Sequence, residues 1–128
     1  DGADPALDIM TEVVAFLQRS VAIAEHAGIP RDRIVVDPGI GFGKTPEQSI
    51  ETLAKLDRLA VLGLPMLVGA SRKRFIDTVA PSTVTERLGG SIAAHVLAME
   101  AGAAIIRTHD VRETLQALKV ASAIRKAR

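Results

Sequence analysis

Three short, fully apolar segments constrain the fold of this chain more than any other feature. They cover residues 34–36, 66–68 and 104–106, and segments with helical patterns separate them. Strands that are apolar on both faces are typical of parallel βαβ units, in which helices cover both sides of the sheet. Hairpin turn signals are missing between them, so the sequence predicts an α/β fold with parallel strands.

Four segments around these strands carry the periodicity and the end signals of helices. Asp4 and Pro5 are predicted to cap and open the first helix, and Thr45 with Gln48 forms a capping box for the second. Asp110 is predicted to open the last helix. By residue number the helices are expected to run from 4 to 28, from 45 to 63, from about 85 to 102 and from 110 onward.

Two features interrupt this alternation of helices and strands. Residues 69–83 are predicted to form a long basic loop, and the next helix contains the pair Gly89 and Gly90. Because a helical glycine costs about 1 kcal/mol relative to alanine, we expect the pair to mark close packing against a neighbouring element.

The number of strands indicates how the fold is completed. Three parallel strands leave both edges of a sheet open, and one face of each helix has no partner. A (β/α)8 barrel needs about 250 residues. We therefore expect residues 1–128, with three strands and four helices, to be the last half of a single barrel domain. A small open sheet is the alternative.

Composition excludes several classes of partner. Sixteen basic and 15 acidic side chains give a net charge of +1, which provides no field to attract nucleic acid or an anionic membrane. No apolar run approaches the roughly 20 residues that span a bilayer. The chain has no cysteine, which fits a reducing compartment. We expect a cytoplasmic protein with neither nucleic-acid nor membrane partners.

Functional residues are expected just after the strands, because parallel α/β folds place their sites at the carboxyl ends of strands. Three segments qualify: residues 37–45, 69–74 and 107–110. Together they offer a carboxylate, lysine and arginine side chains and a histidine.

The first segment is not a nucleotide-binding loop. Its Gly43-Lys44-Thr45 sequence resembles the end of a phosphate loop, but that motif needs glycine at position 38, where Pro38 stands. The glycines at 39, 41 and 43 also lack the spacing of a dinucleotide fingerprint. Alternate glycines around Phe42 instead suggest a backbone that approaches a flat ligand closely, and a flexible loop is the alternative.

The charged side chains of these segments each allow two interpretations. Asp37 ends an apolar strand and needs hydrogen-bond donors, either from a ligand or from a salt bridge or loop cap. The basic run from 71 to 74 follows a strand, which favours anion or ligand binding over a solvated surface.

The third segment combines an arginine and a histidine. Arg107 and His109 alternate across a strand end and can point into one pocket, where a phosphate would also meet the helix that Asp110 opens. The alternative for His109 is a bond to Asp110. His26 and His95 lie in predicted helices and are expected to be structural.

Four groups of residues, in order and at βα spacing, resemble the dihydropteroate synthase family. The likeness as a whole runs from about residue 9 to about residue 125. The groups are Asp37-Pro38-Gly39 with Gly41-Phe42-Gly43-Lys44, Gly69 with Ser71-Arg72-Lys73, Glu86-Arg87-Leu88 with Gly90-Ser91, and Ile106-Arg107 with His109-Asp110-Val111.

The resemblance implies a pterin-binding (β/α)8 barrel that condenses 6-hydroxymethyl-7,8-dihydropterin diphosphate with p-aminobenzoate, releasing pyrophosphate. Asp37 would accept hydrogen bonds from the N–H edge of the pterin, which suits a bidentate carboxylate. Lys73 would contact the pterin beside the p-aminobenzoate position, while Arg107 and His109 would grip the diphosphate. Phe42 and Ser71 would line the second substrate's site, and the catalytic residues would be Lys73, Arg107, and His109; the substrate-binding set would also include Gly41 and Gly69.

The resemblance also implies Mg²⁺, held through the diphosphate and through parts of the family fold that have no counterpart here, and a homodimer formed through the C-terminal helices. No residue of this chain is assigned to the metal. Asp77 follows Ile76 where the family often has glycine, which affects the local shape of that loop.

Two alternatives accompany this hypothesis. A methyltetrahydrofolate-binding domain of a methyltransferase would share an aspartate at a strand end, but would not need Arg107 and His109 for a diphosphate. The other alternative is a non-catalytic half-barrel that needs a partner to supply the missing strands.

Overall fold

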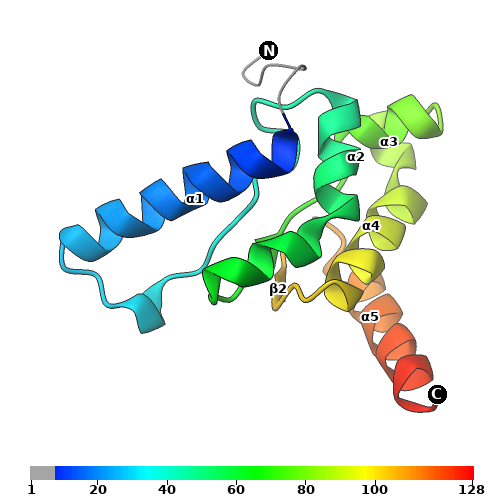
Figure 1. Ribbon diagram of the computed structural model, residues 1–128. Helices are drawn as coiled ribbons and strands as arrows, with labels where there is room; N and C mark the ends of the chain where they lie inside the picture. The colour runs from blue at the N-terminus through cyan, green and yellow to red at the C-terminus, as the bar shows by residue number, and fades with distance from the viewer. Residues whose placement is uncertain (1–7) are drawn as a thin grey trace.

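The computed structural model describes residues 8–128, in which helices pack against a small parallel sheet (Figure 1). The strands are β1 (Leu67–Val68) and β2 (Ile105–Ile106). The α-helices are α1 (Ile9–His26), α2 (Pro46–Ala54), α3 (Arg74–Val79), α4 (Leu88–Glu100) and α5 (Val111–Lys126), and the 3₁₀ helices are η1 (Arg31–Arg33), η2 (Leu56–Leu62) and η3 (Val84–Glu86).

The three predicted strands lie side by side and in parallel, but they are shorter than expected. β1 pairs with β2 in parallel, with Leu67 opposite Ile105 and Val68 opposite Ile106. On the other side of β1, Val36 and Met66 form a single parallel bridge. The run at 34–36 is therefore not a full strand, because its pairing with the neighbouring segment is a single bridge and not a continuous ladder. The prediction of a mixed α/β fold with parallel strands is confirmed.

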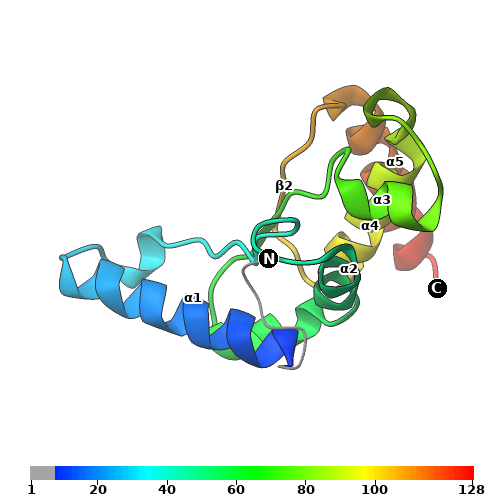
Figure 2. The same cartoon turned by 90° about the horizontal axis from the view of Figure 1, so that it is seen from above.

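Helix α1 buries one stripe of apolar side chains. Asp8 caps it by accepting the Met10 N–H at 3.1 Å. The cap and first turn predicted at Asp4 and Pro5 lie outside the described residues. Figures 1 and 2 show α1 extending away from the group formed by α3, α4 and α5. Its buried residues are Ile9, Met10, Val13, Leu17 and Val21.

The helix predicted from 45 to 63 divides into two. The capping box of Thr45 and Gln48 is present, as predicted, and opens α2. The helix then breaks at Lys55, whose φ is −122° and ψ 26°, and continues as η2. Leu56, Leu59 and Leu62 are buried in η2. Their spacing of three matches the three residues per turn of a 3₁₀ helix, which places all three on one face.

The segment predicted as one long loop from 69 to 83 contains helix α3, so that prediction was wrong. Two apolar side chains of α3, Phe75 and Ile76, are buried. Six residues are too few to show helical periodicity in the sequence. A Cβ on Gly90 would lie 2.5 Å from Ile76 Cγ2, which confirms close packing for that glycine, while Gly89 faces open space.

The end of the chain also differs in detail from the prediction. The helix expected over 85–102 consists of η3 and α4, and α5 begins after Asp110 as predicted. Asp110 makes no side-chain cap bond to α5, because its carboxylate binds Arg72 instead. Among residues 8–128, no helix is both long enough and apolar enough to cross a membrane.

Candidate active site

The three segments that follow the strands contact one another pairwise. Lys73 Nζ donates to the carbonyl of Ile40, which joins the second segment to the first. Ser71 Oγ lies 2.7 Å from His109 Nδ1, which joins the second to the third. Arg107 Nη2 lies 3.8 Å from Asp37 Oδ2, which joins the third to the first. The fold therefore brings the predicted site residues together at one end of the sheet.

The segment 37–45, here called the glycine loop, is held mainly by hydrogen bonds to its own backbone carbonyls. Gly39, Gly41 and Gly43 have φ values of 71°, 82° and 59°, a region that side chains strongly disfavour. Lys44 Nζ donates to the carbonyls of Pro38 at 2.7 Å and Gly39 at 2.8 Å. Burial lowers the pKa of Lys44. Lys44 therefore closes the loop and is not free for a ligand.

Asp37 makes both of the structural contacts that the sequence left open. Its Oδ1 accepts the Gly39 N–H at 2.8 Å, and its Oδ2 faces Arg107. At 3.8 Å the second contact is an ion pair and not a hydrogen bond. The side chain is 38% exposed, so a donor-rich edge of a ligand can still reach the carboxylate.

Lys73 is the most constrained of the predicted catalytic side chains. Its ammonium lies 4.5 Å from the centroid of the Phe42 ring, a cation–π distance, while the ring itself is 67% exposed. Gly41 makes room for it, because a Cβ there would lie 3.1 Å from Lys73 Cδ. Burial, with a smaller contribution from Arg107, lowers the pKa of Lys73, and Asp37 opposes that change.

Gly69 has the same relation to Arg107 that Gly41 has to Lys73. A Cβ on Gly69 would lie 3.1 Å from Arg107 Nε and 3.1 Å from Arg107 Nη2. The guanidinium therefore packs against the backbone at the end of β1. This contact gives Gly69, which the sequence placed in the site, a physical role.

The histidines divide as the sequence suggested. His109 bonds to Ser71 and not to Asp110, whose carboxylate binds Arg72. His95 is fully buried, and its Nε2 accepts the Ala70 N–H at 3.0 Å. Burial lowers the pKa of His95 to about 4. His95 therefore supports the backbone beneath Ser71 as a neutral ring.

Two cavities adjoin these residues. Gly41, Phe42 and Lys73 line one of about 470 Å³, to which Arg74 and Phe75 also contribute. Arg74 belongs to the basic run for which the sequence favoured ligand binding, although it was not among the named site residues. Phe75 was not predicted, because the short turn into α3 that brings it to the cavity gives no sequence signal. The second cavity, of about 690 Å³, lies between α1 and the glycine loop.

Asp37 lines the second cavity, whereas Gly69, Ser71, Arg107 and His109 line neither of the two. Among the described residues, no group of three or more His, Cys, Asp or Glu side chains is arranged to hold a metal ion. The residues present therefore do not form a Mg²⁺ site by themselves.

The chain matches known proteins over most of its length. Residues 3–109 match the model of a family described as pterin binding enzymes. Because this match covers more than half of the chain, the chain belongs to that family. The relatives described next are dihydropteroate synthases.

Two relatives and two solved structures show how far the likeness extends. The dihydropteroate synthase of Escherichia coli (strain K12) is 40% identical over 94% of this chain and 43% of its own length. The Synechocystis sp. enzyme is 42% identical over 91% of this chain and 41% of its own length. The crystal structure of the Stenotrophomonas maltophilia enzyme with active site-bound imidazole gives a TM-score of 0.91 at 42% identity, covering 96% of this chain and 47% of that one.

The enzyme from Xanthomonas albilineans in complex with 7,8-dihydropteroate gives a TM-score of 0.90 at 43% identity, over 94% of this chain and 47% of that one. The chain thus spans less than half the length of the relatives it matches, and it corresponds to their C-terminal part.

Proposed function

We propose that this chain forms the C-terminal part of a dihydropteroate synthase, the enzyme that joins 6-hydroxymethyl-7,8-dihydropterin diphosphate to p-aminobenzoate. The observation that carries the proposal is the pairwise contact of the three strand-end segments. It places the carboxylate of Asp37 beside the cations of Lys73 and Arg107. A pterin diphosphate needs this combination, because the ring presents N–H donors and its leaving group is anionic.

The proposed roles follow from the geometry of each side chain. The exposed part of the Asp37 carboxylate accepts from the pterin N–H edge, and Lys73, above the Phe42 ring, contacts the pterin beside p-aminobenzoate. Arg107 and His109 bind the diphosphate, with Ser71 holding the His109 ring. Gly41 and Gly69 provide the space in which the two cations lie.

The proposed reaction needs no protein nucleophile. The amine nitrogen of p-aminobenzoate attacks the exocyclic carbon of the pterin, the carbon–oxygen bond breaks, and its electron pair leaves with pyrophosphate. The amine then loses a proton. The protein's part is to hold the two substrates in line and to stabilise the charge on the departing oxygen through Arg107 and Lys73.

We also propose that the chain is the last part of a (β/α)8 barrel. Both edges of the observed three-segment sheet lack a further partner among the described residues, and its order of elements is that of consecutive βα units. Full-length relatives that are about twice as long support this assignment. A methyltransferase domain finds no support among the relatives reported above.

Three further features of the proposal rest on the family resemblance. Mg²⁺ would be held by the diphosphate and by residues outside this chain. The compartment would be the cytoplasm, which the lack of cysteine fits. The functional unit would be a homodimer formed through the C-terminal helices.

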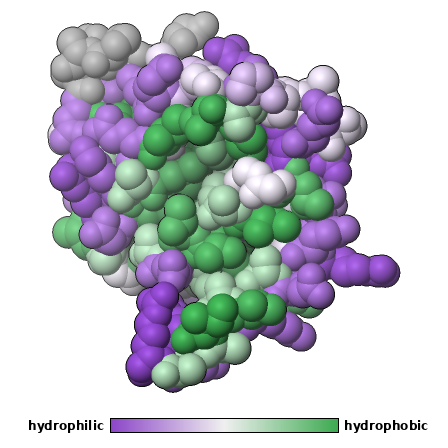
Figure 3. All heavy atoms as spheres, turned by 90° about the vertical axis from the view of Figure 1, so that its right-hand side faces the viewer, coloured by the Kyte–Doolittle hydropathy of each residue, from purple (hydrophilic) through white to green (hydrophobic). Residues whose placement is uncertain are grey.

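The proposed dimer has a suitable face. Figure 3 shows hydrophobic side chains gathered on the side of the molecule where α2, α3 and α4 lie in Figure 1. A groove of about 340 Å³ runs between these helices, and its lining is almost entirely apolar. Leu97, which lines it, is 62% exposed. In a dilution series, Leu97→Glu should make the full-length protein monomeric; an unchanged mass would contradict the use of this face.

Pyrophosphate release by the full-length parent, given dihydropterin diphosphate, Mg²⁺ and p-aminobenzoate, tests the proposed function. Release should require p-aminobenzoate, and Lys73→Ala should lower kcat/KM by at least about 100-fold. Lys55→Ala is the matched control, because Lys55 pairs with Glu51 at the surface and has no role in the proposed site. Release without p-aminobenzoate, or equal rates in the two variants, would refute the assignment.

A further inference from the structure

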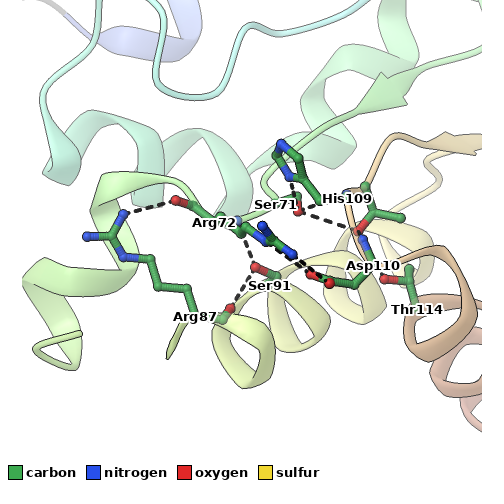
Figure 4. A network of polar contacts seen from close by, with 8 residues as sticks. Ser71, Arg72, Arg87, Ser91, His109, Asp110 and Thr114 are labelled. Atoms are coloured by element: carbon green, nitrogen blue, oxygen red, sulfur yellow. Dashed lines mark hydrogen bonds and ion pairs between the residues drawn. The ribbon is translucent and has the colours of Figure 1, made fainter. Parts of the chain in front are cut away.

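Arg72 lies between two residues of the proposed site but is not part of it. Within the described chain it is the one residue other than glycine with a positive φ, 58°. A left-handed conformation is unfavourable for a residue with a side chain and persists when the surroundings hold it. The contacts that hold Arg72 come from two other parts of the chain (Figure 4).

The guanidinium of Arg72 joins the loop that follows β1 to the loop that follows β2. Its Nη2 lies 2.8 Å from Asp110 Oδ1 and its Nε 3.3 Å from Asp110 Oδ2. This paired geometry fixes the orientation of both groups, which a single contact does not. The hydrogen bond from Arg72 holds the pKa of Asp110 below its usual value.

The backbone of Arg72 is held by Ser91 in α4 and by Arg87, the residue that precedes α4. Its N–H donates to Ser91 Oγ at 2.8 Å, and its carbonyl accepts from Arg87 Nη1 at 3.0 Å. Ser91 is fully buried and donates in turn to the Arg87 carbonyl at 2.7 Å. Both sides of the Arg72 backbone are therefore bonded to one helix end, which leaves it little freedom to rotate.

The ion pair connects residues that flank the site on both loops. Ser71 precedes Arg72 and Lys73 follows it, while His109 precedes Asp110. We propose that Arg72 and Asp110 are positioning residues, whose ion pair fixes Ser71, Lys73 and His109 relative to one another. The proposal rests on the proposed function for the roles of Lys73 and His109, and it adds two residues that need not touch a substrate.

The bond between Ser71 and His109 shows what this positioning achieves. Ser71 Oγ accepts the backbone N–H of His109 at 3.1 Å and lies 2.7 Å from His109 Nδ1. Either atom can donate in this bond; when the hydroxyl donates its proton to Nδ1, the ring hydrogen is on Nε2. Nε2–H is then a donor for an anionic group. The ion pair keeps the two loops in the register that this bond needs.

The test uses the full-length protein with Arg72→Met, Asp110→Asn and the double variant. We expect each single change to lower kcat by at least about 10-fold with a smaller change in KM, because misplaced groups lose transition-state contacts. The double variant should be no worse than about the poorer single one, since both changes remove the same pair. Arg72→Lys, which keeps the charge but not the fork, should recover part of the loss.

Arg58→Met is the matched control. Arg58 forms a surface ion pair with Asp8 at 3.8 Å and has no role in the proposed site, so its loss should leave kcat unchanged. Thermal unfolding must show every variant folded at the assay temperature; if Arg72→Met is unfolded, the nearly isosteric Asp110→Asn decides. Single variants that match the control, or losses that multiply in the double variant, would overturn the proposal.

A second measurement separates this proposal from the proposed function. In ¹³C-labelled histidine spectra of the full-length protein, His109 should show one neutral tautomer, and a mixture of tautomers in Arg72→Met and Asp110→Asn. If the wild type and the control release no pyrophosphate, the proposed function fails. The histidine spectrum then tests by itself whether the ion pair positions His109. An unchanged His109 signal in both variants would then refute it.

Discussion

Two loops contribute side chains to the candidate active site but are held in place differently. One is the glycine loop at 37–45, and the other is the segment that follows β1, here called the basic loop (69–74). The glycine loop is held mainly by local contacts, which are three glycines of positive φ, the bonds of Lys44 to carbonyls of the loop and the bond from the Gly41 N–H to Ser49 Oγ. The basic loop depends on residues far along the chain, including His95 beneath Ala70 and Asp110 against Arg72. The glycine loop should therefore be less sensitive than the basic loop to substitutions in distant parts of the chain.

The two loops also share one feature. Gly41 in the first makes room for Lys73, and Gly69 in the second makes room for Arg107. In both cases the glycine borders a cation that comes from the next strand end along the chain. Each loop therefore leaves room for a cationic side chain of the segment that follows the next strand.

Acid should weaken the basic loop far more than the glycine loop. Burial lowers the pKa of His95 from 6.5 to about 4. The unfolded chain therefore takes up the proton first, and the stabilisation is complete above about pH 6.5 and lost as pH falls toward 4. We expect this group to lower the free energy of unfolding by up to roughly 3 kcal/mol over that range, at about 1.4 kcal/mol per unit.

Urea unfolding of the full-length protein between pH 7 and pH 4 measures this effect. His95→Gln is the comparison, because an amide can still accept from Ala70 but does not titrate there. The difference in stability between the wild type and the variant should shrink or reverse on acidification. Parallel pH curves for the two proteins would show that the ring is not buried in its neutral form.

The next largest effect is expected at Gly41. In Gly41→Ala the alanine would have to adopt a φ of +82°, and its Cβ would lie 3.1 Å from Lys73 Cδ. Strain and displacement of Lys73 act together, so we expect kcat/KM to fall by about 30-fold. Steady-state kinetics of the full-length enzyme measure this, and activity near that of the wild type would mean that Lys73 does not need this space.

Gly69→Ala should have a weaker effect of the same kind. Its φ lies outside the positive range, so the only cost is displacement of Arg107, whose Nε and Nη2 lie 3.1 Å from the new Cβ. Arg107 is 60% exposed and can move. We expect a loss of about 5-fold in kcat/KM, mainly through a higher KM for the pterin diphosphate. A loss greater than that of Gly41→Ala would reverse the ranking.

The smallest effect is expected from Lys44→Met, which tests whether the glycine loop is held mainly by local contacts. Loss of the charged donor should lower the free energy of unfolding by about 1 kcal/mol. Amide exchange should rise in the glycine loop and stay unchanged in the basic loop. Lys55→Met, at an exposed pair with Glu51, is the control and should change stability by less than about 0.5 kcal/mol. Equal exchange changes in both loops would contradict the comparison.

Much of the site was predictable because its residues lie at strand ends. Asp37, Lys73, Arg107 and His109 could be placed together from the order of apolar runs, since parallel strands end at the same edge of a sheet. Arg72, Arg87 and Ser91 were not singled out as a unit. Their contact depends on how α4 packs beneath the basic loop, and sequence spacing does not report packing.

The βα order, the parallel arrangement, the capping box at Thr45 and the three segments that carry polar groups could be predicted from the amino-acid sequence. These depend on local patterns, because hydrophobic periodicity and capping involve residues close together in the chain. Three features depend on packing between distant segments: Leu56–Leu62 is a 3₁₀ helix, α3 lies within the segment predicted as a loop, and Asp110 binds Arg72 instead of capping α5. Such outcomes depend on which side chains from distant segments compete for the same space and the same hydrogen bonds.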